Sequence, residues 1–189
     1  MSFSEMLAVL IGCVFVNNYV LVRFVGFEHI ANDSKKNAKY NAKVSLLFTL
    51  ILVIATTITF PLDKWVLIPN GFEWARNLVY VLVIALSVFL VETLIMKRTA
   101  EWLKYDSINV VLNSVVLGTL LFNQSYNYDW LTSYFAVIGT GIGYFLVATI
   151  VSGLRKRIDM KAVPESFRGV PIYLATLTIL SLAVYAFAS

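Results

Sequence analysis

The sequence predicts an all-α membrane protein with six transmembrane helices, arranged as two inverted repeats of three helices each. Apolar residues make up 59% of the 189 residues, and the mean hydropathy is +0.79. Charged residues make up only 14%, compared with about a quarter of a soluble domain. The apolar residues gather in six segments with short polar loops between them, so we expect a single membrane domain over residues 1–189.

The six segments differ in length and in polar content. They cover residues 6–27, 44–60, 78–96, 108–122, 131–154 and 170–188. A helix needs about 20 mostly apolar residues to cross the hydrocarbon core of a bilayer. The third, fifth and sixth segments meet this requirement, and the second meets it if its polar flank joins the helix. We expect the first and fourth segments to be broken or half-helices, because they are short or are interrupted by amide side chains.

Basic residues are concentrated on one side of this topology. The loops after the first, third and fifth segments carry twelve of the fifteen lysines and arginines, whereas the opposite loops carry only Lys64 and Arg76. An excess of basic residues is typical of cytoplasmic loops. We therefore expect these three loops in the cytoplasm and both termini on the outer side. The same bias accounts for the net charge of +4, so the charge gives no reason to expect a nucleic-acid partner.

The two halves of the chain, residues 1–100 and 101–189, each contain three segments, so the second half is inverted relative to the first. In each half the first segment is the irregular one. Asn17 and Asn18 interrupt one of them, and Asn113 and Ser114 interrupt the other. Broken helices at matching positions of inverted halves indicate a site near the membrane midplane. The three asparagines have two open interpretations: they cap the backbone and join helices, or they take part directly in a permeation or redox site.

Glu92 lies within the third segment. A carboxylate at the centre of a span costs about 2.5–3.5 kcal/mol on insertion scales. One interpretation is therefore an ion or proton site, or an ion pair buried in the bundle. The other is a residue at the cytoplasmic end of the span, solvated or paired near Lys97 and Arg98.

Other motifs in the chain have simpler interpretations. Residues 139–143 read GTGIG, but they lie inside an apolar segment with no strand before them, which excludes a phosphate-binding loop. We expect Gly139 and Gly143 to form a face for close helix packing instead. Cys13 is the only cysteine, which excludes a disulfide and a metal site of several cysteines within the chain. No catalytic motif is visible, and we expect no catalysis by this chain alone.

Two stretches of the sequence resemble a family of membrane proteins. Residues 16–26 read VNNYVLVRFVG and resemble the opening of RnfA and NqrE, membrane subunits of the Rnf and Na⁺-translocating NADH:quinone oxidoreductase complexes. Residues 163–169 read VPESFRG, which is the most specific match. Further matches occur in order and at similar spacing over essentially the whole chain. The opening favours the RnfA/NqrE branch over the RnfE/NqrD partner branch.

The resemblance implies a six-span inverted-repeat protein of the bacterial inner membrane, paired with an oppositely oriented RnfE/NqrD-like homologue. In this family, one cysteine at each half-helix of the two chains holds a [2Fe-2S] cluster at the membrane midplane. The cluster passes electrons between flavin and iron–sulfur subunits, and the electron flow is coupled to movement of Na⁺ or H⁺. These properties are expectations that rest on the resemblance.

The chain departs from the family pattern at both cluster positions. The resemblance places the first cysteine at Glu28 and the second at Ser114. Cys13 lies about 20 Å before Glu28 along a helix, at 1.5 Å per residue, so it does not replace the first cysteine. Carboxylate and hydroxyl oxygens are poor ligands for iron in a sulfide cluster. We therefore expect no cluster ligand from this chain, and a site that is either empty or occupied by a cation or water.

The sequence supports three functional hypotheses. The first is membership of an Rnf/Nqr-type ion-translocating electron-transport complex, as a diverged copy whose cluster is lost or replaced. The second is a transporter of ions or small solutes on the same scaffold, without a cluster. The third is a protein that only holds its neighbouring subunits together. The sequence names neither the coupling ion nor the electron donor and acceptor.

Overall fold

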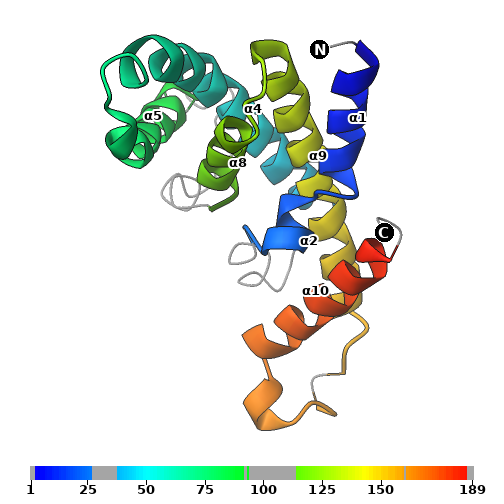
Figure 1. The fold of residues 1–189 in the computed structure, drawn as a ribbon. Coiled ribbons are helices and arrows are strands. Elements are labelled where there is room, and N and C mark those ends of the chain that lie inside the picture. The colour runs from blue at the N-terminus through cyan, green and yellow to red at the C-terminus, as the bar shows by residue number, and fades with distance from the viewer. Residues whose placement is uncertain (1–2, 27–37, 92, 94–113, 160, 187–189) are drawn as a thin grey trace.

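The computed structural model describes residues 3–26, 38–91, 93, 114–159 and 161–186. Every regular element within these ranges is helical, which confirms the predicted all-α class (Figure 1). The α-helices are α1 (Phe3–Val14), α2 (Tyr19–Arg23), α4 (Ala38–Leu62), α5 (Arg76–Val91), α8 (Ser114–Ser125), α9 (Trp130–Arg155) and α10 (Val170–Tyr185). Short 3₁₀ helices, Glu73–Ala75 and Glu165–Phe167, precede α5 and α10.

Three of these helical stretches are long and apolar enough to cross a bilayer. They are Ala38–Leu67, Glu73–Val91 and Trp130–Arg155. The expected sixth span is shorter than predicted, because the 16 residues of α10 rise only about 24 Å against roughly 30 Å of hydrocarbon core. The arrangement of six spans in two inverted repeats stays a prediction, because residues 27–37 and 94–113 lie outside the described ranges.

The first segment is interrupted, as its sequence predicted, whereas the break in the fourth segment stays a prediction because residues 108–113 lie outside the described ranges. In the first segment α1 ends at Val14, and α2 begins only at Tyr19 and covers five residues. In the fourth segment α8 begins at Ser114 and covers 12 residues. The second segment does include its polar flank, since α4 starts at Ala38.

The C-terminal end of α4 contains a proline and changes helix type. Pro61 has no backbone N–H, and its ring crowds the preceding turn, so a regular α-helix is weakened at this point. The chain continues as a π-helical turn, Asp63–Leu67, before it turns back into α5. This turn buries Asp63 at the side of α4 that faces α5.

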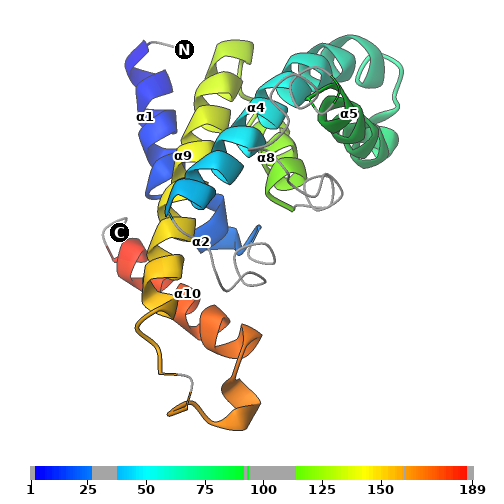
Figure 2. The same ribbon diagram turned by 180° about the vertical axis from the view of Figure 1, so that it is seen from behind.

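α9 is the central helix of the bundle. It runs through the length of the molecule, with α1 beside one half and α10 beside the other (Figures 1 and 2). Helices α4, α2 and α8 also pack against it. Leu52 of α4, Val116 of α8 and Val137 of α9 have no exposed surface and lie in the apolar core between these helices.

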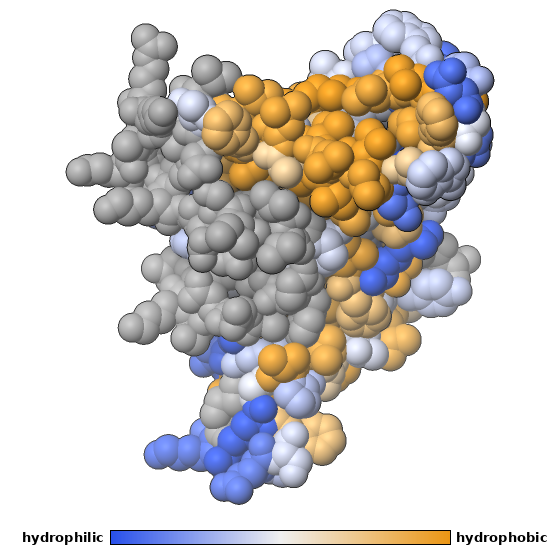
Figure 3. All heavy atoms as spheres, turned by 90° about the vertical axis from the view of Figure 1, so that its left-hand side faces the viewer, coloured by the Kyte–Doolittle hydropathy of each residue, from blue (hydrophilic) through white to orange (hydrophobic). Residues whose placement is uncertain are grey.

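The face of the molecule over α4 and α5 carries a large apolar area (Figure 3). Figure 3 shows a continuous apolar area over the α4–α5 side, with polar residues above it and at the lower end. On α5 the exposed apolar side chains include Leu78, Leu82, Leu86 and Phe89, which recur every three or four residues along the helix. An apolar stripe of this kind on a helix that is long enough to span a bilayer fits contact with lipid or with another membrane protein.

Candidate functional site

Helix α9 presents a glycine face to the first apolar segment. A Cβ placed on Gly139 would lie 2.7 Å from the Leu10 carbonyl oxygen and 2.9 Å from Cys13 Cβ. A Cβ placed on Gly143 would lie 2.6 Å from Asn18 Nδ2. These distances are too short for any side chain, so glycine alone allows α1 to approach α9 this closely. The predicted packing face of Gly139 and Gly143 is therefore confirmed.

Asn18 closes the gap between α1 and α2. Its side chain is buried, with Nδ2 donating to the Val14 carbonyl oxygen at 2.9 Å. Its Oδ1 accepts from the Val20 N–H at 3.0 Å. One amide thereby binds the last turn of α1 and the first turn of α2, where backbone groups lack partners within a helix. Asn17, the neighbouring residue, is exposed.

Helix α2 lies alongside α8 and runs in the opposite direction. The Tyr19 ring at the start of α2 packs on the Phe122 ring near the end of α8, with 4.8 Å between the ring centres. A Cβ on Gly118, one turn earlier in α8, would lie 3.1 Å from Val25 Cγ1. These contacts hold the two half-helices of the first and fourth segments together along their length.

The sequence analysis missed the role of Arg23 in this contact. Arg23 ends α2, and its guanidinium carbon lies 4.2 Å from the centre of the Phe122 ring. Its Nη2 also donates to the Tyr126 hydroxyl at 3.3 Å. A cation above an aromatic face is attracted by the ring quadrupole. The basic residue within the VNNYVLVRFVG stretch therefore fastens α2 to α8.

The two half-helix tips meet through a hydrogen bond. The Gly26 N–H donates to Ser114 Oγ at 2.8 Å, across 88 residues of sequence. The chain reaches this point through Phe24 and Gly26, with φ angles of 54° and 79°. Glycine adopts the second conformation without the steric cost of a Cβ. Ser114, in the first turn of α8, thus lies against the chain two residues before Glu28.

Three of the predicted site residues fall outside the described ranges. They are Glu28, Glu92 and Asn113. Of the described ones, Asn18 lies at the start of α2, and Ser114 lies at the opposite end of the α2–α8 contact. The interpretations of Glu92 as an ion site or as an end residue both stay open.

Ser114, the described residue at one of the two expected cluster positions, is not an iron–sulfur ligand of the usual kind. Such clusters are held by thiolates, or in some cases by imidazoles. Ser114 offers a hydroxyl oxygen that already accepts a backbone hydrogen bond. Cys13, the only cysteine of the chain, is buried in the contact with Gly139 on α9. Oxygen donors of the Ser114 kind suit water or a hard cation instead.

A buried ion pair lies at the connection between α4 and α5. Arg76 Nε donates to Asp63 Oδ1 at 2.7 Å, and the two side chains are 21% and 3% exposed. Thirteen residues separate the partners, so no helical spacing in the sequence could have revealed the pair. The pair joins the π-helical turn after α4 to the first turn of α5.

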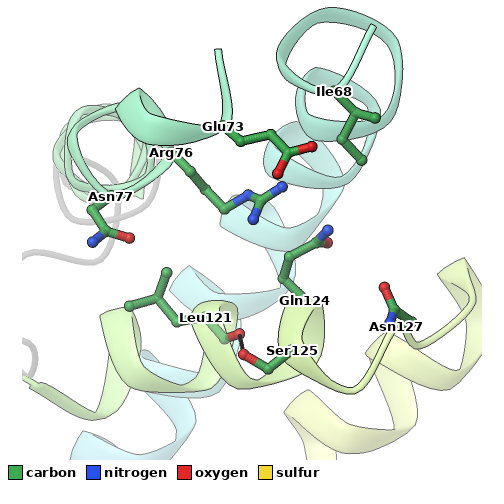
Figure 4. Close-up of a pocket in the computed structure, with 8 residues that line it drawn as sticks. All are labelled: Ile68, Glu73, Arg76, Asn77, Leu121, Gln124, Ser125 and Asn127. Atoms are coloured by element: carbon green, nitrogen blue, oxygen red, sulfur yellow. Dashed lines mark hydrogen bonds between the residues drawn. The ribbon is translucent and has the colours of Figure 1, made fainter. Parts of the chain in front are cut away.

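An open polar hollow, here called the vestibule, lies next to this ion pair. It has a volume of about 550 Å³ and lies between the α4–α5 connection and the C-terminal end of α8 (Figure 4). Figure 4 shows the Arg76 guanidinium between the Glu73 carboxylate and the Gln124 amide. The polar lining of the vestibule consists of Glu73, Arg76, Asn77, Gln124, Ser125 and Asn127.

Comparisons with known proteins match the whole chain. The family model described as Rnf-Nqr subunit, membrane protein, covers residues 6–189. The ion-translocating oxidoreductase complex subunit (RnfA) of Syntrophotalea carbinolica is 33% identical over 98% of this chain and 97% of that protein. The protein of the same name from Azoarcus sp. is 34% identical over 98% of this chain and 97% of its own length. The one from Vibrio cholerae El Tor is 33% identical over 97% and 96%.

These matches confirm the resemblance carried by residues 16–26 and 163–169. They cover nearly the full length of this chain and of each relative, in agreement with the matches noted along the whole sequence. The chain belongs to the Rnf-Nqr family of membrane subunits.

Proposed function

We propose that the chain is an integral membrane subunit of an Rnf/Nqr-type ion-translocating electron-transport complex. The observation that carries this proposal is the similarity to relatives named as RnfA subunits of ion-translocating oxidoreductase complexes, over 98% of this chain and 97% of the relative. Because the similarity covers nearly all of this chain and nearly all of the relative, it relates whole membrane subunits and not only a shared motif. Electron flow through the complex is coupled to movement of Na⁺ or H⁺.

The partners follow from the same proposal. The chain pairs with an oppositely oriented RnfE/NqrD-like homologue in the bacterial inner membrane, and the pair contacts flavin and iron–sulfur subunits. Both termini lie on the outer side, since the basic loops lie in the cytoplasm. The apolar stripe of Leu78, Leu82 and Phe89 on α5 supports a lipid or subunit contact on that side.

At the junction of α2 and α8, residues with oxygen ligands stand where the family has the cysteine ligands of its cluster. The family resemblance assigns Glu28 and Ser114 to the two cluster positions, so this chain offers no cysteine ligand at either of them. The bond from the Gly26 N–H to Ser114 Oγ supports this, because it places a hydroxyl oxygen and not a thiolate at this point. The junction is empty or binds water or a cation, and any [2Fe-2S] cluster of the complex takes its thiolates from other chains.

Purification of the tagged full-length chain from its native membranes tests the complex. We expect flavin and iron–sulfur subunits to copurify, together with an RnfE/NqrD-like homologue. A chain that purifies without them contradicts the proposal and favours a transporter that works alone.

Spectroscopy of the reduced complex tests the junction. We expect every [2Fe-2S] signal in electron paramagnetic resonance to persist in the Ser114→Ala variant. Glu28→Cys combined with Ser114→Cys should create a new signal if the partner keeps its pair of cysteines. A midplane signal in the unmodified complex that disappears on substitution of a residue of this chain would contradict the assignment.

Thiol labelling tests the topology. Cysteines introduced at Lys161 and at Asp129, each in a Cys13→Ser background, should react with a membrane-impermeant reagent from opposite sides. Both positions are exposed; Asp129 directly precedes α9, and Lys161 follows its last residue by six positions. Labelling of both from the same side would contradict the predicted orientation.

A purely structural subunit is the second candidate function. The engaged Ser114 hydroxyl favours it, because that bond joins two half-helices where the family has a redox site. Glu92→Gln tests whether this chain takes a direct part in ion movement through Glu92, which a purely structural subunit would not. In an ion-translocating subunit that uses Glu92, the variant should assemble normally and show reduced coupled ion movement. Normal assembly with normal ion movement would remove Glu92 from the ion route.

A further inference from the structure

Many helical hydroxyl groups in the described part of the chain bond to the backbone one turn earlier. The side chains of Thr49, Thr59, Ser87, Thr119, Thr140 and Ser152 each donate to the carbonyl oxygen four residues before them. This bond satisfies a polar group inside an apolar helix. Thr56 in α4 is an exception, since it is 3% exposed and its Oγ1 has no hydrogen-bond partner in the described part of the chain.

Asn123 of α8 also has a buried polar atom without a hydrogen-bond partner in the described ranges, and it lines the same small cavity as Thr56. It is 6% exposed, and its Oδ1 has no partner among the described residues. Its Nδ2 makes only a long contact of 3.4 Å with the Ser133 carbonyl oxygen. Thr56 and Asn123 line one small cavity, here called the inner cavity. Its polar lining also includes Thr59, Tyr80, Gln124, Tyr128 and Ser133.

The inner cavity has the size and chemistry of a water site. Its volume of about 20 Å³ exceeds the roughly 10–15 Å³ that one water molecule needs, and such a water requires two to four polar partners. Among the described residues that line it, none carries an ionised side chain, so nothing there compensates the charge of a bound ion. Leaving a buried hydroxyl or amide oxygen unmet costs free energy, which a bound water recovers.

The inner cavity adjoins the vestibule. Gln124 lines both hollows, so its side chain forms part of the wall of each. Thr56 lies eleven residues before Leu67, the end of the helical stretch Ala38–Leu67, which places it about 16 Å along the helix from that end at 1.5 Å per residue. The inner cavity therefore lies well away from the nearer end of this membrane-capable helix.

We propose that the vestibule and the inner cavity form a hydrated inlet that ends at a water molecule bound by Thr56 and Asn123. Thr56 Oγ1 donates to the water oxygen, and the water donates to Asn123 Oδ1. The water enters past Gln124 from the vestibule. Within an ion-translocating subunit, this inlet brings water to the interior from one face of the membrane, but its existence does not depend on that function.

The sign of a stability change tests the bound water. Thr56→Val keeps the shape of the side chain and removes the hydroxyl. If the water is bound, the variant should unfold at a lower temperature, by about 2–4 °C for the loss of one hydrogen bond in a chain of this size. If the cavity is dry, removal of an unmet hydroxyl should leave the midpoint unchanged or raise it.

Thr149→Val is the matched control. Thr149 Oγ1 is also buried without a partner in the described part of the chain, but it does not line the inner cavity. Its substitution should therefore not lower the midpoint. Unfolding of the full-length chain in nanodiscs can be followed by a thiol-reactive dye, because Cys13 is the only thiol and is buried. Equal midpoints for Thr56→Val and Thr149→Val would overturn the proposal.

Silver ions, which are small and react with thiols, test the route. In a Cys13→Ser background, Thr56→Cys should react at least about tenfold faster than Thr149→Cys, because water reaches only the first position. Adding Gln124→Phe should slow the Thr56→Cys reaction. Equal rates at the two positions, or no effect of Gln124→Phe, would contradict the inlet. A bound cation would instead raise the unfolding midpoint of the unmodified chain in Na⁺ but not in K⁺, and this rise would be absent in Asn123→Leu. Such a result would overturn the assignment of water.

Discussion

Two contacts within this bundle are built in opposite ways. Where α9 meets α1, Gly139 brings the backbones so close that a methyl group would overlap the Leu10 carbonyl oxygen. Where α8 meets the α4–α5 connection, polar side chains surround a vestibule of about 550 Å³ beside the Asp63–Arg76 ion pair. The backbones at the first contact are too close for water to lie between them. The second contact leaves a hollow with a mainly polar lining, which suits water.

The difference shows two ways to associate helices inside a bilayer. Apolar contact between helices gains little there, because lipid is as apolar as leucine. Helices therefore associate through close van der Waals fit or through polar bonds. The α1–α9 contact uses fit, so it should be sensitive to added volume. The contact around the vestibule uses polar bonds, so it should be sensitive to the loss of a partner.

The largest expected effect comes from breaking the ion pair. Asp63→Ala leaves the Arg76 guanidinium without its carboxylate at a site where the aspartate is 3% exposed. Removal of one partner of a buried pair typically costs about 3–5 kcal/mol, and we expect the lower end because Arg76 is partly exposed. Thermal unfolding in nanodiscs measures the loss. Glu73→Ala, an exposed carboxylate near the same arginine, should cost less than about 1 kcal/mol, and an equal loss in both variants would contradict a special role of Asp63.

The glycine face should show the next largest effect. Gly139→Ala places a Cβ 2.7 Å from backbone atoms of α1, which cannot move aside like a flexible side chain. Overpacking of this kind costs about 1–3 kcal/mol. Gly153→Ala on the same helix meets open space and should be neutral or stabilising, since alanine favours a helix by about 1 kcal/mol over glycine. Similar unfolding temperatures for the two variants would remove the distinction between the contacts.

The break between α1 and α2 should respond to loss of its bridging amide. Asn18→Ala removes the bonds to Val14 and Val20 and should lower stability by about 1–2 kcal/mol. Asn17→Ala changes an exposed side chain and should have little effect. Unfolding midpoints of the two variants, measured side by side, check the prediction, which would be wrong if Asn17→Ala were the more damaging substitution.

The smallest expected effect is at the half-helix tips. Ser114→Ala removes the acceptor of the Gly26 N–H and should cost about 0.5–1.5 kcal/mol. Ser125→Ala on the same helix removes only an exposed bond to the Leu121 carbonyl oxygen and serves as the control. Hydrogen exchange of the Gly26 amide offers a second measurement, with faster exchange expected in Ser114→Ala only. Unchanged exchange would show that the bond does not protect this turn.

Much of the fold could be predicted from local composition. The apolar segments predicted the positions of α4, α5 and α9, and amide residues predicted the break after Val14. The glycines of α9 predicted a close helix contact, although not that α1 was the partner. At the candidate site, the sequence indicated Asn18 and Ser114 but not the hydrogen bonds that they make.

The physical reason for this division lies in the bilayer. A segment in lipid must satisfy its backbone within itself, so hydropathy and helix-interrupting residues along the chain determine where helices begin and end. No such local rule selects which helices become neighbours. The Gly26–Ser114 hydrogen bond and the Asp63–Arg76 ion pair each join different elements, and Thr56 and Asn123 come from different helices to line one cavity. Only the packing of side chains in three dimensions decided these pairs, and with them where the molecule is dry and where it has space for water.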